Sequence, residues 1–306
     1  MKVHKMKTHV LINLALLVPC LSRPLKDVSQ PDDTHYAYNY LVKYGYMSEI
    51  SESQESSKLQ SISDAVADFQ SFAGLNRTGD LDNITMELMK MRRCGVKDTS
   101  DTRTKRFALQ GSRWRTRELK YKIGKYPIKS KLTRRQVDEA MEEAFKVWSE
   151  VTNLKFEKIF SGDAHIEVRF ETGNHGDDDP FDGEGGTLAH AFFPIYGGDA
   201  HFDDEEDWTV KSFRGTNLVM SAAHELGHSL GLSHSNVKSS LMAPFYRGYE
   251  PKIRLDQDDI DGIRALYGEK ENEIKSVNSL PQGLPPNDEN INNRVCITNI
   301  ADSKLF

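Results

Sequence analysis

Residues 224 to 234 read His-Glu-Leu-Gly-His-Ser-Leu-Gly-Leu-Ser-His, and their types and spacing are those of a metal site with its own base. In a helix, His224 and His228 lie one turn apart on one face, so both imidazoles can bind one ion. Glu225 projects beside them. A glycine three residues after the second histidine can leave helical geometry, which lets the chain return His234 as a third ligand. Three protein ligands leave a fourth position for water, as in catalytic rather than structural zinc sites.

Two histidines four residues apart are more often a solvated helix face or a core contact than a metal site. The full pattern His-Glu-x-x-His-x-x-Gly-x-x-His is far rarer, and chance produces it in roughly one chain in ten thousand of this composition. Met242 follows His234 by eight residues, where zinc proteases with the extended motif have a methionine turn beneath the metal. A lone methionine usually only fills a core, so this assignment depends on the spacing.

Composition limits the classes of function that the chain can have. Its 306 residues suffice for one ordinary domain and a smaller one. The hydrophobic share of 38% and the charged share of 28% are typical of a soluble globular protein. A net charge of -6 argues against a general nucleic-acid binder, and the sequence has no glycine-rich phosphate loop.

The N-terminus has the parts of a secretory signal peptide. Lysines at positions 2, 5 and 7 precede an apolar stretch at residues 10–18, and Pro-Cys-Leu-Ser follows, ending at Ser22. The stretch is too short to span a bilayer. We therefore expect residues 1–22 to be removed and the protein to be secreted to the extracellular space or matrix.

Three cysteines are present, and Cys20 leaves with the signal peptide. Cys94 and Cys296 remain and could pair, but they do not make a disulfide framework. Bound metal ions are the better candidates for stabilising the fold. Cys296 belongs to a weakly patterned segment at residues 269–306, which we expect to be a disordered tail.

Apolar residues recur with helical spacing at residues 36–46, 59–73 and 81–91. This pattern predicts a small helical domain. Glycosylation sequons at Asn76 and Asn83 indicate surface positions within it.

A basic run, Arg-Thr-Lys-Arg, follows this helical domain and ends at Arg106. Such a run is often only solvated surface. Between two domains of an exported chain, however, Arg-x-Lys-Arg is a cleavage signal for a proprotein convertase. Cleavage there defines a pro-domain at residues 23–106 and a second domain, residues 107–268, which begins with Phe107.

The second domain has the pattern of an α+β fold, a mixed twisted sheet with helices. Strand-like alternation occurs at residues 119–123, 154–156 and 166–170. A capping box at residues 133–136 opens a helix whose apolar stripe comprises Val137, Met141, Ala144, Trp148 and Val151. Further helices are expected at about 216–231 and 257–267, the latter with acidic residues in its first turn.

Residues 171–207 contain twelve Asp or Glu residues and no Lys or Arg. A charge run is usually a solvated loop. This one would repel itself unless cations neutralised it. The segment therefore favours bound metal ions over simple solvation.

With these motifs in hand, the chain resembles the matrix metalloproteinases, or matrixins, from about residue 35 to residue 268. Ser235 after the third histidine and the scarcity of cysteines favour matrixins over astacins or reprolysin-like enzymes. The layout is similar to that of a minimal, matrilysin-like member without a hemopexin-like domain. The resemblance implies a metzincin catalytic domain preceded by a small helical pro-domain.

The resemblance identifies Arg93-Cys94-Gly95-Val96 with Asp98 as a cysteine switch, in which Cys94 takes the water's place on the catalytic zinc. A thiolate is a good zinc ligand, and the metal keeps it deprotonated. This chain has Arg92 and Lys97 where the family has proline. Cleavage between Arg106 and Phe107 would remove the thiol.

In the family, the new terminal ammonium pairs with an acid of the last helix, which corresponds to Asp258 here. The resemblance also implies a structural zinc held by His175, Asp177, His190 and His201. It implies a calcium site that comprises Asp182, Gly183, Gly185, Thr187, Asp203 and Glu206. A second calcium would use Gly197 and Asp199, although His165 stands where the family has Asp and the preceding loop is two residues shorter.

The implied activity is that of a secreted zinc endopeptidase made as a zymogen. Glu225 would act as general base on a zinc-bound water that attacks a peptide bond. An extended protein substrate would lie along an edge strand near residues 187–193. Met220, Pro244, Phe245 and Tyr246 would line a pocket for the residue after the cut. Implied partners are extracellular protein substrates, a convertase and tissue-inhibitor-type proteins.

Two other classes of function remain. A zinc-scaffolded binding module would have lost catalysis, and loss of Glu225 would be its mark, but Glu225 is present. A latent secreted regulator would keep its pro-domain, and an N-terminus at Phe107 in the secreted protein would exclude it.

Overall fold

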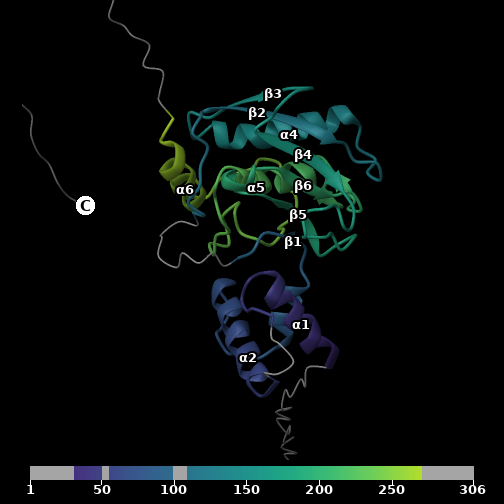
Figure 1. Ribbon diagram of the computed structural model, residues 1–306, viewed down its shortest axis with the longest axis vertical. Helices are drawn as coiled ribbons and strands as arrows, with labels where there is room; N and C mark the ends of the chain where they lie inside the picture. Colours follow the sequence, from purple (N-terminus) through teal and green to yellow (C-terminus); the bar gives the residue numbers. More distant parts are fainter. Residues whose placement is uncertain (1–30, 50–54, 99–108, 271–306) are drawn as a thin grey trace, which may run out of the picture. The chain divides into compact units, whose positions relative to one another are not determined.

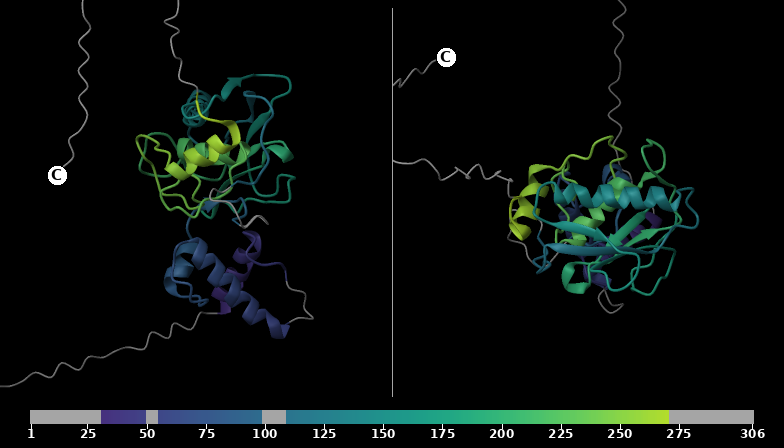
Figure 2. Two further views of the ribbon diagram at one scale, coloured as in Figure 1. Left: turned by 90° about the vertical axis from the view of Figure 1, so that its left-hand side faces the viewer. Right: turned by 90° about the horizontal axis from the view of Figure 1, so that it is seen from above.

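The computed structural model describes residues 31–49, 55–98 and 109–270 (Figures 1 and 2). The signal peptide, the basic run with its cleavage site and the segment from residue 271 lie outside the described residues, so those expectations stay predictions. Among the described residues, no helix is long and apolar enough to cross a membrane.

The N-terminal part is the helical domain that the apolar spacing predicts. Its helices are α1 (Pro31–Lys43), α2 (Glu55–Phe72) and α3 (Asn83–Met89). The first helix starts earlier than expected and ends at Lys43, because Gly45 adopts a positive φ of 85° and the chain turns there. Asp82 caps α3 by accepting a hydrogen bond from the Thr85 amide. The helices share a core that includes Ala37, Tyr40, Leu41, Val66, Phe69 and Met89.

The second domain is built on a six-stranded mixed sheet with the order β1-β5-β6-β4-β2-β3. Its strands are β1 (Arg93–Cys94), β2 (Glu118–Lys125), β3 (Lys155–Lys158), β4 (Ile166–Glu171), β5 (Thr187–Ala191) and β6 (Ala200–Asp203). β5 runs antiparallel to β6, and the other pairs are parallel. The predicted α+β class is thereby confirmed. A short pair, β7 (Trp208–Thr209) and β8 (Thr216–Asn217), lies outside this sheet.

Two helices, α4 (Arg134–Ser149) and α5 (Leu218–Ser229), lie side by side and pack into one core with the sheet (Figures 1 and 2). The predicted capping box of α4 is present, because Thr133 and Gln136 bond to each other's backbone amides. Trp148, fully buried on α4, donates its indole hydrogen to the Ala223 carbonyl at 2.9 Å. This bond holds α5, which carries the histidine motif, in a set position on the core.

The helix expected at 216–231 is shorter than predicted. Thr216 and Asn217 form β8, since Asn217 has extended backbone angles and caps α5 by accepting from the Met220 amide at 3.0 Å. At the other end, α5 stops at Ser229 because Gly231 has a φ of 104°. Val151, expected on the α4 stripe, lies beyond the end of α4 and packs half-buried on the core. The last helix, α6 (Gln257–Tyr267), matches its prediction.

A substitution at Gly227 can test how closely α5 packs against the turn that contains Met242. A Cβ added there would collide with Met242 Sδ and lie 3.0 Å from Trp148. We expect Gly227→Ala to lower the free energy of unfolding by about 1–3 kcal/mol, because the better helix propensity of alanine does not offset overpacking. Thermal denaturation measures the change. Glu139→Ala, on the exposed face of α4, is the control and should stay within about 0.5 kcal/mol; an unchanged Gly227→Ala protein would contradict the packing.

Candidate metal centre

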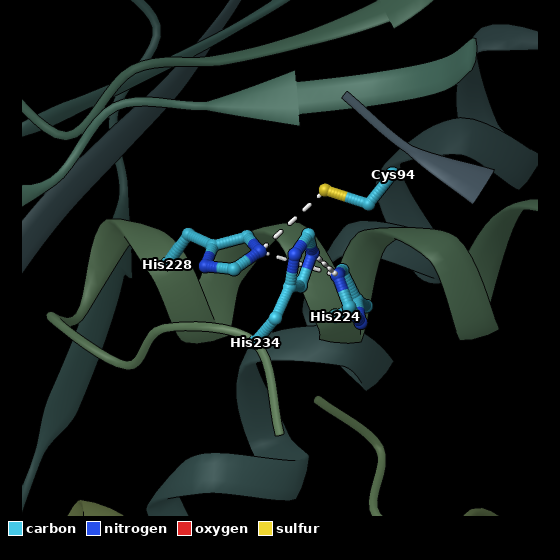
Figure 3. A group of neighbouring side chains, drawn as sticks. All are labelled: Cys94, His224, His228 and His234. Carbon is cyan, nitrogen blue, oxygen red and sulfur yellow. Dashed lines mark hydrogen bonds between the residues drawn. The ribbon is translucent and has the colours of Figure 1, made fainter. Parts of the chain in front are cut away.

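α5 and the loop after it bring the three histidines of the motif together (Figure 3). His224 Nε2 lies 3.2 Å from His228 Nε2 and 3.3 Å from His234 Nε2. On the far side of their rings, His224 Nδ1 donates to the Leu241 carbonyl and His228 Nδ1 to the Leu232 carbonyl, each at 2.7 Å. A carbonyl can only accept, so these bonds place the ring protons on Nδ1 and leave the Nε2 lone pairs facing one another.

These nitrogens fit a zinc ion. All three side chains are buried. Burial lowers the pKa of His224 to about 3, with His234 adding to the effect, and it holds the pKa of His228 well below its usual value. Neutral imidazoles with converging lone pairs repel unless they share a cation. Together with Cys94 they form a group whose ligand atoms all lie within 4.8 Å of one another, which suits tetrahedral zinc.

Cys94 reaches this group from β1. Its sulfur lies 3.5 Å from His228 Nε2 (Figure 3). It also lies 3.4 Å from a carboxylate oxygen of Glu225. Burial raises the pKa of the thiol, and the charge of Glu225 adds to this. A cation held by the imidazoles would reverse that preference and favour the thiolate. The thiol therefore stands where a fourth ligand belongs.

The segment around Cys94 occupies the edge of β5, the strand along which we expect the substrate to bind. β1 pairs with β5 in parallel. The Gly95 amide donates to the Ala189 carbonyl at 2.8 Å, and the Cys94 amide donates to the Pro244 carbonyl at 3.0 Å. The edge of the sheet and the rim of the metal group are thus covered by one short stretch of chain.

A buried ion pair holds this stretch. Arg93 and Asp98 lie 2.5 Å apart with almost no exposed side-chain surface. Burial alone would raise the pKa of Asp98, but Arg93 and His234 hold it at about 2. Asp98 also bonds His234 Nδ1 at 2.7 Å and accepts from the Tyr46 hydroxyl at 2.7 Å. The Arg93 pair was expected; the bond to His234 was not, because only the fold brings position 98 to the third histidine.

Glu225 lies on α5 beside the histidines and is buried. Burial raises the pKa of its carboxyl group to about 8, against the opposing effect of the bond from Cys94. Burial thus favours the protonated carboxyl group, and a cation held by the neighbouring imidazoles would favour the carboxylate, the form that can take a proton.

The turn at Met242 lies directly against α5, since a Cβ on Gly227 would meet its sulfur. Asp259, on α6 and 1% exposed, bonds the turn: it accepts from the Leu241 amide at 2.7 Å and from the Met242 amide at 3.1 Å. The sequence analysis missed Asp259. The available signal was its place in a second capping box with Asp256, which predicts a helix start but not a bond to the turn.

A second histidine group forms where β5 and β6 pair. His190 and His201 are opposite each other in the antiparallel register, and His175 and Asp177 come from the acidic loop. One oxygen of Asp177 lies 2.7–2.8 Å from a nitrogen of each imidazole. Burial lowers the pKa of both strand histidines. The structure thus brings the predicted ligands together, and the closed set of four donors suits structural zinc.

The loop expected to bind calcium is folded around the buried carboxylates of Asp203 and Glu206 and the exposed carboxylate of Asp182. Asp203 accepts from the Gly183 amide at 3.1 Å, Glu206 accepts from the Gly185 amide, and Asp182 accepts from the Thr187 amide at 2.9 Å. Burial raises the pKa values of Asp203 and Glu206. Several acids held close together in this way fit a hard cation.

The expected second calcium position fits less well. Asp199 Oδ1 accepts from the Glu167 amide at 2.8 Å, and Gly197 lies nearby with a φ of 106°. His165 accepts the Lys120 amide proton through Nδ1 at 2.9 Å. Imidazole is a poor ligand for calcium, which prefers oxygen.

Comparisons with known proteins agree with this geometry. The family model described as Matrixin matches residues 113–268, and one described as a putative peptidoglycan binding domain matches residues 31–89. This chain belongs to the matrixin family. It is 48% identical over 228 residues to macrophage metalloelastase of Rattus norvegicus, covering 74% of this chain and 47% of that protein. It is 44% identical over 270 residues to stromelysin-1 of Mus musculus, covering 85% and 54%. The chain spans about half the length of the curated relatives it matches.

The predicted pocket residues of this matrixin also lie together. Met220, Pro244, Phe245 and Tyr246 line one cavity with Cys94, His224 and Glu225. Asp258 accepts from the Ser235 hydroxyl at 2.6 Å. Its expected partner, Phe107, and the cleavage site at Arg106 lie outside the described residues.

This chain has Arg92 and Lys97 where the family pattern has proline, and Arg92 makes contacts with the second domain. Arg92 donates to the Thr216 hydroxyl at 3.2 Å and lies 3.8 Å from Glu184. The buried hydrogen bonds of Arg93, Cys94 and Gly95 do not involve the Arg92 side chain. Backbone pairing and the Arg93–Asp98 pair therefore stabilise this segment in place of proline.

Arg93→Met tests the ion pair. The variant leaves the Asp98 carboxylate buried without its cation, which costs about 3–5 kcal/mol and should release the switch segment. We expect Cys94 to react with iodoacetamide at least tenfold faster in the uncleaved protein, measured by mass spectrometry of the Cys94 peptide. Arg92→Met, which breaks a more exposed contact, is the control. Equal alkylation rates in wild type and Arg93→Met would contradict this role.

Asp177→Asn tests the second histidine group. The amide cannot supply the carboxylate that faces all three imidazoles, so we expect zinc per chain to fall from two to one, with loss of thermal stability. Elemental analysis of purified protein measures zinc. Asp178→Asn, next to it in the same loop, should keep both ions. Two zinc ions in the Asp177→Asn protein would argue against this group as a metal site.

Proposed function

We propose that this matrixin is a zinc-dependent endopeptidase, made as a zymogen, that cleaves extracellular matrix or other extracellular proteins. One observation carries the proposal: three converging imidazole nitrogens have the Glu225 carboxylate beside them and the Cys94 thiol over them. A structural zinc site would have no use for a neighbouring carboxylate that does not join the ligand group.

The residues of the group have separate roles in hydrolysis. Zinc bound by His224, His228 and His234 supplies a Lewis acid for the peptide carbonyl and lowers the pKa of a water. Glu225 takes the proton from the attacking water and delivers it to the leaving amine. Its oxygen is 3.4 Å from the Cys94 sulfur, so the base stands beside the position that the thiol fills in the latent protein.

Substrate binding uses the edge that the switch segment covers. Once Arg93 and Cys94 leave, the free edge of β5 can pair with an extended substrate strand. The side chain after the cleaved bond then enters the cavity lined by Met220, Pro244 and Tyr246. Apolar side chains fit most of that wall.

Activation follows from the basic run. A proprotein convertase cuts between Arg106 and Phe107, which detaches Cys94 and frees the base. The new N-terminal ammonium of Phe107 pairs with Asp258. The Asp258 carboxylate accepts a hydrogen bond from Ser235, which directly follows the third histidine in the chain. The signal peptide expected at residues 1–22 supports a location of these events in the secretory pathway and of the product outside the cell.

Calcium stabilises the active domain at the loop of Asp203 and Glu206, where hydrogen bonds from glycine amides hold the carboxylates. A second calcium at Gly197 and Asp199 has weaker support. Tissue-inhibitor-type proteins are the expected inhibitors, because they would bind to the β5 edge and the adjoining pocket once the switch segment has left.

Glu225→Gln separates zinc binding from catalysis. The amide keeps the shape of the side chain but cannot take a proton, so we expect kcat/KM on a quenched fluorescent peptide to fall at least a thousandfold. The measurement uses secreted, convertase-processed protein whose N-terminus is shown to be Phe107. Zinc content should be unchanged.

Glu139→Gln, on the exposed face of α4, serves as the matched control and should retain full activity. A zinc chelator should abolish the wild-type rate. If processed wild-type protein holds zinc but cleaves no member of a broad peptide library, the zinc-scaffolded binding module replaces the endopeptidase as the better hypothesis.

A further inference from the structure

The cavity beside the metal group contains a buried hydroxyl that the catalytic mechanism does not use. Ser221 lies on α5 one turn before Glu225, is 7% exposed and lines the cavity. Its oxygen is buried and has no hydrogen-bond partner among the residues that the structure describes. A buried polar atom without a partner in a ligand cavity calls for an explanation.

Two other polar side chains of the cavity wall, outside the metal group, each have a hydrogen-bond partner. The Tyr246 hydroxyl accepts from the Asn217 amide at 2.7 Å, and the Arg247 guanidinium donates to the Lys238 carbonyl at 2.7 Å. The remaining wall is mainly apolar, with Leu188 and Leu241 among its residues. Ser221 is thus a residue of this mainly apolar wall whose hydroxyl has no hydrogen-bond partner among the described residues.

The position of Ser221 sets the length of a side chain that can reach it. Helix rise places Ser221 about 6 Å along α5 from Glu225, which must stand at the scissile bond. An extended glutamine side chain carries its amide about that far from its backbone, whereas serine and threonine are too short. Methionine has nearly the same length but no strong hydrogen-bonding group.

We propose that Ser221 is a specificity-determining residue that lets the pocket take glutamine, an amide side chain, at the position after the cleaved bond. The inference rests on the proposed endopeptidase function. A hydrocarbon side chain that fills the cavity excludes water and leaves the hydroxyl unpaired, whereas the glutamine amide pairs with it. The pocket thus discriminates less against glutamine than a purely apolar pocket does.

The test compares two peptides that differ only in glutamine or methionine after the cleaved bond. Processed wild-type enzyme and Ser221→Ala are assayed for kcat/KM on both. We expect the ratio of glutamine to methionine cleavage to fall about tenfold in Ser221→Ala. Ser221→Thr keeps the hydroxyl and should keep the ratio within about threefold of wild type.

Ser233→Ala is the matched control, because the Ser233 hydroxyl is also buried and unpartnered among the described residues but does not line this cavity. Its ratio should equal that of wild type. An unchanged ratio in Ser221→Ala, or the same fall in Ser233→Ala, overturns the assignment. If folded, zinc-loaded wild type cleaves neither peptide nor any other, the proposed endopeptidase fails instead.

Discussion

Three neutral imidazoles, with the His224 nitrogen within 3.3 Å of the other two, are the constraint on which the rest of the structure depends. Their convergence costs free energy by itself, since lone pairs point at lone pairs and the rings are buried. The surrounding structure prevents the rings from turning away. Carbonyls of the following loop and turn fix His224 and His228, and Asp98 fixes His234. The site is held ready for a cation by bonds on the outer side of each ring.

Those outer bonds join distant parts of the chain to the metal group. The Leu241 carbonyl, which accepts from His224, lies in the turn that Asp259 of α6 holds by hydrogen bonds. Trp148 of α4 donates to the Ala223 carbonyl and so fixes α5, the helix that carries His224. A shift of α6 or α4 would therefore move a ligand. Elements far from the histidines in the sequence thus help to fix the position of the ligands.

The sequence predicted the elements with strong local signals and missed what depends on long-range contacts. The capping box at Thr133 and the acidic first turn of α6 placed helix starts well. The start of α5 was missed by two residues, because Asn217 serves both as a strand residue and as a cap. Metal ligands were identifiable because motif spacing on one helix, and family resemblance in the acidic loop, carry that information.

Other site features had no comparable signal in the sequence. Asp98 bonds His234 across 136 positions, and Asp259 bonds the methionine turn from a different helix. Ser221 is an ordinary helix residue in the sequence, and its unpartnered hydroxyl becomes visible only when the cavity is known. Such features arise from tertiary packing, and no local pattern encodes them.

Latency and catalysis compete for the same groups in this fold. The switch segment uses the β5 edge, the Pro244 carbonyl, the position next to Glu225 and the outer nitrogen of His234. Each of these is a group that the active enzyme would need for substrate or for orienting its ligands. Displacing the intact segment would break its backbone bonds to Pro244 and Ala189 and the bond between Asp98 and His234, whereas the Arg93–Asp98 pair lies within the segment itself. The proposed cleavage at Arg106 would detach the switch segment without requiring a substrate to compete for each of these contacts.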